Sequence, residues 1–231
     1  RAVEQQYSGT ALVTGASSGI GAATARMLAR QGWRVICAAR RADRLAEQVR
    51  ALGSGAIALT LDISDATSVD TLLERLPDDW KTIDVLINSA GRDVGGRHRF
   101  DIGSMAEWAK TIETNAIGTM RVTHAVVPGM LNRARGHIVN IGSTSSVNAY
   151  AGGAAYVASK FALNGFTKSI LADYLGKGVR VTHILAGLTR TNFVESRLRG
   201  DKSGADEFYG TFPVTLKPED IARTILFAIE Q

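Results

Sequence analysis

Short apolar runs alternate with amphipathic stretches along almost the whole chain, and this alternation limits the fold more than any other feature. Six runs rich in Val, Ile, Leu and Ala predict strands at 10–14, 34–38, 56–61, 84–88, 136–141 and 178–184. Strands that are apolar at successive positions are buried on both faces, as in a parallel sheet between two helix layers. The sequence therefore predicts an α/β fold with a single doubly wound parallel sheet and helices on both faces.

Helical patterns fill the intervals between these strands. We expect helices at 22–29, 42–52, 65–76, 104–114, 116–132, 155–175 and 218–229. Composition does not shift along the chain, so we expect one domain over residues 1–231. The segment 188–216 is rich in charge and glycine and lacks a regular pattern, and we interpret it as an irregular insertion at the substrate.

Charge and composition narrow the classes of partner. The net charge of +5 would suit nucleic acid, but the arginines are dispersed without interleaved aromatic residues, so we expect no nucleic-acid partner. No apolar run reaches the roughly 18 to 20 residues that span a bilayer, so we expect no membrane association. Cys37 is the only cysteine, which excludes an internal disulfide and favours a cytoplasmic protein. We assign no metal site.

A glycine-rich turn follows the first predicted strand directly and precedes a helix. Its spacing is G-x-x-x-G-x-G over residues 15–21. Glycine lets backbone approach a phosphate closely, and the unpaired N–H groups at a helix start attract negative charge. A purely structural turn is the alternative, but the strand before and the helix after favour dinucleotide binding, the Rossmann arrangement. The residues expected at the pyrophosphate are Gly15, Ser17, Ser18, Gly19, Ile20 and Gly21.

The end of the second predicted strand indicates which dinucleotide is bound. An acidic residue at this point would bond the adenosine 2′-hydroxyl and select NAD. The chain instead has Ala39 followed by Arg40 and Arg41. Guanidinium groups suit the 2′-phosphate of NADP, so we predict NADP as the cofactor. The alternative is that both arginines only solvate the start of the next helix.

Tyr156 and Lys160 lie four residues apart in the longest helical pattern, so both project from one face. A nearby ammonium favours the phenolate, which suits Tyr156 as the acid for ketone reduction and the base for alcohol oxidation. Such a pair is frequent by chance. Ser143 adds weight, because it follows the fifth predicted strand at the sheet edge where open α/β sheets bind ligands. Asn115, between two helical patterns, can bond exposed backbone or a water.

Together these motifs resemble the short-chain dehydrogenase/reductase family in its core single-domain form. The matching pieces come in the family's order and cover nearly the whole chain: Thr14 to Gly21, Asp62, Asn88 to Gly91, Asn115, Ser143, Tyr156 and Lys160. The resemblance implies an NADP-dependent enzyme that moves a hydride between nicotinamide and an alcohol or carbonyl. Two positions depart from the family pattern: Ser89 replaces the usual second Asn, and Ala186 replaces the usual Pro.

The resemblance also implies roles for individual residues. Lys160 would hold the nicotinamide ribose and lower the pKa of Tyr156. Ser143 would polarise the carbonyl, and Asn115 would anchor a water in a proton relay. Asp62 and Ile63 would contact the adenine. Further contacts to the cofactor would come from Asn88, Ala90, Gly91, Gly187, Thr189 and Thr191.

Local motifs are similar to one branch of the family, the bacterial NADP-dependent dehydrogenases of serine and other small 3-hydroxy acids. These motifs lie at 138–144, 150–153, 192–193 and 197–201. We therefore expect a small-molecule substrate, with a 3-hydroxy acid such as serine as the first candidate. Arg197, Arg199 or Lys202 could supply a cation for its carboxylate, unless all three are solvated loop surface. The alternatives are a reductase of a larger ketone or aldehyde, and a non-catalytic NADP-binding regulator.

The helices expected at 116–132 and 155–175 carry apolar residues on more than one face. A helix packed on a sheet needs only one apolar face, so the surplus suggests burial between subunits. The family resemblance implies dimers of dimers through these helices. We expect a homotetramer, with a simple dimer as the alternative.

Overall fold

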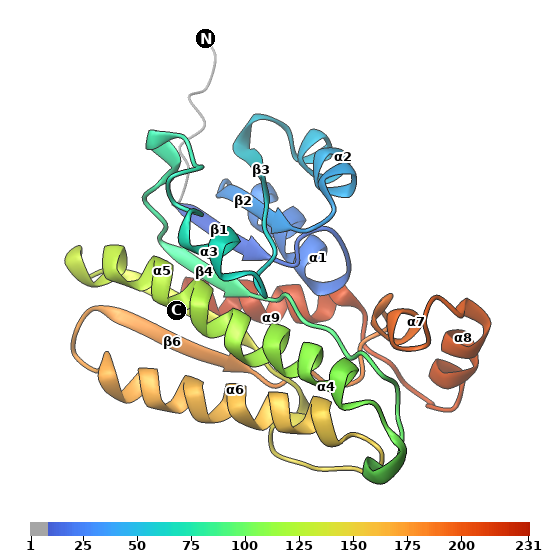
Figure 1. The fold of residues 1–231 in the computed structure, drawn as a ribbon. Coiled ribbons are helices and arrows are strands. Elements are labelled where there is room, and N and C mark those ends of the chain that lie inside the picture. The colour runs from blue at the N-terminus through green and yellow to red at the C-terminus, as the bar shows by residue number, and fades with distance from the viewer. Residues whose placement is uncertain (1–8) are drawn as a thin grey trace.

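Six parallel strands form one sheet in the computed structural model, which describes residues 9–231 (Figure 1). The order across the sheet is β3-β2-β1-β4-β5-β6. The strands are β1 Thr10–Thr14, β2 Arg34–Ala39, β3 Ala56–Thr60, β4 Val85–Asn88, β5 Gly136–Ile141 and β6 Val179–Ile184. The predicted doubly wound parallel sheet is confirmed. Residues 1–8, which the predicted domain includes, lie outside the described residues.

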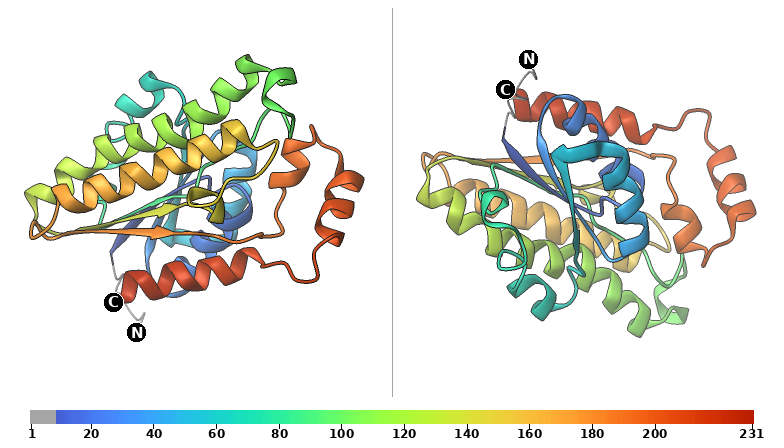
Figure 2. Two further views of the ribbon diagram at one scale, coloured as in Figure 1. Left: turned by 90° about the horizontal axis from the view of Figure 1, so that it is seen from below. Right: turned by 90° about the horizontal axis from the view of Figure 1, so that it is seen from above.

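Helices cover both faces of this sheet (Figure 2). α1 Gly19–Arg30, α2 Ala42–Leu52 and α9 Pro218–Glu230 pack on one face, and α3 Ala66–Asp70, α5 Thr119–Asn132 and α6 Ala154–Asp173 pack on the other. Successive side chains of a strand point to opposite faces of the sheet. Leu12 therefore packs with the helix layer that contains α5, while Ala11 and Val13 pack with the layer that contains α1. The four inner strands are buried on both faces, which explains why they are apolar without alternation, whereas the edge strands β3 and β6 are only partly buried.

The helices predicted at 104–114 and 116–132 form one continuous rod. α4 Met105–Ile112 passes through a π-helical stretch, Glu113–Gly118, into α5. A Cβ at Gly118 would lie 2.7 Å from the backbone oxygen of Ile63, so glycine permits this close packing. The helix predicted at 65–76 was too long, because α3 ends at Asp70 and turns follow it.

The sequence analysis predicted that the segment 188–216 is irregular, and the structure corrects this in part. The segment contains two short helices, α7 Phe193–Arg197 and α8 Lys202–Gly210. Both lie beyond the carboxyl ends of the strands, apart from the main helix layers (Figures 1 and 2). This position brings the segment over the sheet edge where ligands bind in such folds.

Three further observations concern membrane-spanning helices, metal ligands and the cysteine. None of the helices within residues 9–231 combines the length and the apolar character that crossing a bilayer requires. Over the same residues, no three side chains from His, Cys, Asp and Glu gather to hold a metal ion. Cys37 is buried in β2, and burial raises the pKa of its thiol to about 12.

Candidate active site

Two adjoining hollows lie at the carboxyl edge of the sheet. One is lined by the glycine turn after β1, the end of β2 and the segment after β4. The other is lined by residues that follow β5 and β6, by the start of α6, and by α7 and α8. The two hollows share Ile20, Ser89, Gly91, Thr191 and Phe193 in their walls. A single elongated molecule can therefore occupy both.

The glycine turn has the backbone that its sequence predicts. Gly15 and Gly19 have φ values of +70° and +54°, which favour glycine. A Cβ on Gly15 would lie 2.9 Å from the backbone of Ala90, and one on Gly21 would lie 2.5 Å from the oxygen of Gly15. Gly15 is therefore packed too closely on the segment after β4, and Gly21 too closely on Gly15 within the turn, to admit a side chain.

Thr14 ties this turn to the segment after β4. Its hydroxyl accepts hydrogen bonds from the backbone N–H groups of Ser89 and Ala90, each at 3.1 Å. The same hydroxyl donates to the oxygen of Ile87 at 3.4 Å. Ser89, where the family has asparagine, thus keeps its backbone in this contact. Both walls of the first hollow are held in a fixed relation.

The start of α1 offers free N–H groups to this hollow. Ser18 occupies the N-cap position, but its side chain makes no capping hydrogen bond, and the first turn carries no acidic residue. An uncapped helix start is a ready site for a phosphate because its N–H groups and its dipole both favour negative charge. Ser17, Gly19, Ile20 and Gly21 line the same space.

Three arginines gather at the far end of the first hollow. Arg40 and Arg41 line it as predicted, and Arg92 joins them from the segment after β4. Arg41 donates to the hydroxyls of Ser17 and Ser18 at 3.0 and 3.1 Å. Burial lowers the pKa of Arg92, and the neighbouring charge of Arg40 lowers it further. Such a cluster of guanidinium groups favours the binding of an anionic group of a ligand.

Asp62 and Ile63 line the same end of the hollow. The Asp62 carboxylate accepts from the backbone N–H and the hydroxyl of Ser64, at 2.9 and 2.6 Å. Burial raises the pKa of Asp62, but the bonds from Ser64 and the charges of Arg40 and Arg92 outweigh it, so the pKa is lowered. Asp62 therefore stays ionised beside the arginines.

Ala90 and Gly91 line the first hollow, whereas Asn88 lies behind it. The Asn88 amide is buried and donates to Thr123 at 3.0 Å and to Asn140 at 2.8 Å. The structure thus places Asn88 in a polar network inside the protein and not on the wall of the hollow.

Tyr156, Lys160 and Ser143 come together in the second hollow. Lys160 Nζ lies 5.8 Å from the centre of the Tyr156 ring and donates to the backbone oxygen of Ile141 at 2.9 Å. Ser143 lies just beyond β5, and its hydroxyl accepts from the N–H of Ser145 at 3.1 Å. Because the oxygen accepts this bond, the Ser143 O–H can still donate, either to the Tyr156 hydroxyl or to a substrate oxygen in the hollow.

Burial is the largest cause of the pKa shifts of Tyr156 and Lys160. It raises the pKa of Tyr156 to about 12, although the hydrogen bond from Ser143 and the charge of Arg197 oppose the shift. Burial also lowers the pKa of Lys160 to about 8. The expected lowering of the Tyr156 pKa is therefore not found in the protein alone: loss of hydration outweighs the Ser143 hydrogen bond and the charge of Arg197, and Lys160 is not among the causes of the shift.

Asn115 lies in the π-helical stretch and bonds backbone, one of the two possibilities that the sequence left open. Its Oδ1 accepts from the N–H of Arg92 and its Nδ2 donates to the oxygen of Arg92, both at 2.8 Å. Nδ2 also donates to the hydroxyl of Ser159 at 3.0 Å. The side chain thus fixes the segment after β4 to the helix that carries Tyr156.

Gly187, Thr189 and Thr191 follow β6 and line the second hollow. The hydroxyl of Tyr209, on α8, lies 3.1 Å from the backbone oxygen of Thr189 and 3.3 Å from the N–H of Thr191. Tyr209 is buried, so these contacts attach α8 firmly to the segment that leaves the sheet.

The three basic candidates of the segment 188–216 separate in the structure. Arg197 is buried beside the site, with its guanidinium carbon 5.9 Å from the centre of the Tyr156 ring. Its Nε lies 2.6 Å from the carboxylate of Asp93. Arg199 instead pairs with Glu107 on α4, outside the hollow, and Lys202 is exposed at the start of α8. Only Arg197 fits the expected position.

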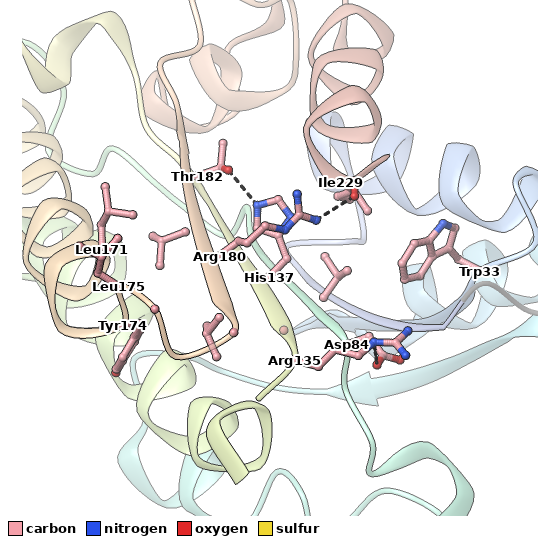
Figure 3. Close-up of a pocket in the computed structure, with 16 residues that line it drawn as sticks. Trp33, Asp84, Arg135, His137, Leu171, Tyr174, Leu175, Arg180, Thr182 and Ile229 are labelled. Carbon is pink, nitrogen blue, oxygen red and sulfur yellow. Dashed lines mark hydrogen bonds and ion pairs between the residues drawn. The ribbon is translucent and has the colours of Figure 1, made fainter. Parts of the chain in front are cut away.

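A larger hollow at the opposite, amino-terminal edge of the sheet does not share this chemistry (Figure 3). Arg180 there donates to the backbone oxygen of Ile229 at 2.9 Å, His137 bonds Thr182 at 2.8 Å, and Arg135 pairs with Asp84 at 3.6 Å. Its polar groups are thus largely engaged with one another. The predicted catalytic residues all lie at the other edge.

Some residues of the site were not assigned a role from the sequence. Arg92 adds a third cation to the first hollow, Asp93 pairs with Arg197, and Arg97 lines the second hollow. All three lie in the irregular stretch after β4, where no periodicity indicates which side chains face inward. The high content of glycine and arginine in 92–99 is the one sequence feature that could have indicated this stretch as a wall of the pocket.

The parallel sheet, the glycine cradle and the adjoining Ser143, Tyr156 and Lys160 define a dinucleotide-binding oxidoreductase. A family model described as short chain dehydrogenase matches residues 9–202. The chain belongs to the short-chain dehydrogenase family, and the resemblance noted in the sequence is confirmed.

Individual relatives agree with this assignment. The chain is 36% identical over 225 residues to serine 3-dehydrogenase of Agrobacterium fabrum (strain C58 / ATCC 33970), covering 97% of this chain and 89% of that protein. It is 38% identical over 215 residues to the NADP-dependent 3-hydroxy acid dehydrogenase YdfG of Escherichia coli (strain K12), covering 93% and 86%. A solved structure, the closed form of serine dehydrogenase complexed with NADP+, superposes with a TM-score of 0.91 at 37% identity, covering 94% and 88%.

Proposed function

We propose that this protein is an NADP(H)-dependent dehydrogenase that interconverts a small 3-hydroxy acid and the corresponding carbonyl compound. The observation that carries this proposal is the convergence of Tyr156, Lys160, Ser143 and Arg197 in one hollow, adjoining a second hollow rich in arginine. The names of the relatives support the same cofactor and class of substrate.

The first hollow fits NADP. The free N–H groups at the start of α1 and the glycine cradle would hold the pyrophosphate. Arg40, Arg41 and Arg92 would hold the 2′-phosphate, and Asp62 and Ile63 would border the adenine. Since the two hollows adjoin, Tyr156 and Lys160 would border the nicotinamide end, together with Gly187, Thr189 and Thr191. When bound, the reduced cofactor supplies the hydride.

The residues of the second hollow would carry out the proton transfer to and from the substrate oxygen. In reduction, the Tyr156 hydroxyl donates its proton to the substrate oxygen, and in oxidation the phenolate takes it back. The Ser143 hydroxyl donates a hydrogen bond to the same oxygen. Lys160 would bind the nicotinamide ribose through Nζ and, when charged, would stabilise the phenolate of the neighbouring Tyr156. Asn115 holds the segment after β4 in place. The family resemblance implies that it also anchors a water in a proton relay.

Arg197 would bind the substrate carboxylate. A 3-hydroxy acid carries its carboxylate two carbons from the reacting carbon, and Arg197 lies beside the Tyr156 ring. Asp93 contacts Nε, so the Nη groups of Arg197 remain available for a second carboxylate. The segment 188–216 would then act as the part of one domain that covers the substrate.

The remaining proposals concern the protein in the cell. We place it in the cytoplasm, with a small molecule as its substrate. We also propose a homotetramer, supported by Phe161 and Leu171, which are 44% and 47% exposed on α6. Apolar side chains this exposed on a long helix are suited to burial between subunits.

Steady-state kinetics with charged and neutral substrates test the proposed function. We expect Arg197→Ala to raise the KM for 3-hydroxybutanoate by at least about tenfold and to leave a neutral alcohol such as 2-butanol little changed, since a charge-assisted pair is lost. Arg199→Ala removes the same charge outside the hollow and is the matched control. Equal effects of Arg197→Ala on both substrates, or no NADP+ reduction with any 3-hydroxy acid, would contradict the proposal.

A further inference from the structure

The hollow around Tyr156 is lined by cations but by no carboxylate. Arg97, Lys160 and Arg197 contribute to its wall, and within residues 9–231 no Asp or Glu does. An ammonium group on a substrate would therefore meet positive charge without a counter-ion. This matters because serine, the substrate named for two relatives, carries both a carboxylate and an ammonium.

The nearest carboxylate is already engaged. Asp93 is 5% exposed and lies 2.6 Å from Nε of Arg197. Oδ2 of Asp93 is taken by Arg197, so a substrate ammonium would have to share this carboxylate with a buried guanidinium of the same charge. Arg97 adds a second positive charge near the same carboxylate. The three charges together leave a net excess of one cation.

Guanidinium groups also lie over three of the aromatic rings that could attract an ammonium. Arg97 lies 4.3 Å from the ring centre of Tyr150 and 5.5 Å from that of Phe208. Arg197 lies 5.4 Å from the ring centre of Phe193 and 6.0 Å from that of Phe208. Aromatic rings hold organic cations through their faces, and at each of these three rings a guanidinium already lies near the ring centre.

The same wall suits an apolar substituent. Leu188, Phe208 and Phe212 line the hollow, and Phe208 and Phe212 contact each other with ring centres 5.3 Å apart. A substrate with a carboxylate at Arg197 and a hydrocarbon group against Leu188 and Phe212 would satisfy both kinds of lining. We infer that the substrate is a 3-hydroxy acid, or the matching 3-oxo acid, that has an apolar substituent and lacks an ammonium group. This inference rests on the proposed function and narrows it.

Two pairs of substrates test the inference directly in NADP+ reduction. L-Serine and 3-hydroxypropanoate differ only by the ammonium group, and we expect kcat/KM to be at least about tenfold higher for 3-hydroxypropanoate. 3-Hydroxybutanoate and 3-hydroxy-3-phenylpropanoate differ in the size of the apolar group, and we expect the phenyl compound to be used at least as well. Calorimetric titration of the NADP+-saturated protein should give the same order of affinities.

A charge change at Arg97 provides a second test. Arg97→Glu places a carboxylate beside Tyr150, so we expect the ratio of kcat/KM for serine to that for 3-hydroxypropanoate to rise by about tenfold or more. The matched control is Arg99→Glu, because Arg99 pairs with Asp101 and does not line the hollow.

The possible results separate this inference from the proposed function. Serine used as well as 3-hydroxypropanoate, with no effect of Arg97→Glu on the ratio, would overturn the inference and leave the proposed function standing. Absence of turnover with every 3-hydroxy acid, while NADP+ still binds, would overturn both.

Discussion

At the scale of single residues, burial sets the ionisation of the catalytic pair. Lys160 is 7% exposed, and burial lowers its pKa to about 8 from an ordinary value of 10.5. Between these values the unfolded chain binds a proton that the folded protein lacks, so the free energy of unfolding rises with pH in this window. Below pH 8 the cost of burying Lys160 is fully present, at about 3 kcal/mol. The charged side chain of Lys160 thus lowers the free energy of unfolding at neutral pH.

Lys160→Met should therefore stabilise the protein while it abolishes turnover. We expect the free energy of unfolding at pH 7 to increase by up to about 3 kcal/mol, because an apolar side chain of similar length replaces the buried amine. The increase should disappear between pH 8 and 10.5. Urea denaturation across this pH range measures it, and Lys168→Met, an exposed lysine on the same helix, is the control. A less stable Lys160→Met protein at pH 7 would contradict this account.

At the scale of elements, a buried polar network attaches the catalytic helix to the sheet. Asn140 on β5 is fully buried, accepts from Asn88 on β4 at 2.8 Å and donates to Thr167 on α6 at 2.9 Å. Thr123 on α5 accepts the other bond from Asn88, at 3.0 Å. Four elements that surround the site thus share one set of hydrogen bonds.

Removal of one member should leave buried partners unsatisfied. We expect Asn140→Ala to lower the free energy of unfolding by about 2–4 kcal/mol, because the amide of Asn88 and the hydroxyl of Thr167 both lose a partner. Asn148→Ala, an exposed asparagine on the segment after β5, should change it by less than about 0.5 kcal/mol. Chemical denaturation distinguishes the two, and equal small effects would show that the network adds little stability.

The sequence was informative for elements with long periodic patterns and less so for short ones. The strands and α6 were predicted to within two residues, because continuous burial and helical spacing extend over many positions. α7 and α8, with 5 and 9 residues, span too few turns to show a clear pattern. The pairing of Asp93 with Arg197 depends on how the insertion folds over the sheet, and no spacing in the chain reveals it.

At the scale of the whole molecule, strand order explains where the site forms. The chain runs outward from β1 to β3 and then crosses back to β4 on the other side of β1. Such a switch leaves a crevice at the carboxyl ends of the strands, because the connections leave in opposite directions. The glycine turn lies on one side of this crevice and Ser143 on the other. The order of motifs in the sequence predicted this arrangement because each motif follows a strand.

The most direct test of the account separates binding of the cofactor from proton transfer. Tyr156→Phe removes only the phenolic oxygen of a side chain that lies in the second hollow, away from the arginine cluster. NADPH binding, followed by fluorescence, should keep a Kd within about threefold of the parent, whereas kcat should fall by at least about a hundredfold with loss of general acid catalysis. Turnover retained by Tyr156→Phe at more than a tenth of the parent rate would contradict the role proposed for Tyr156.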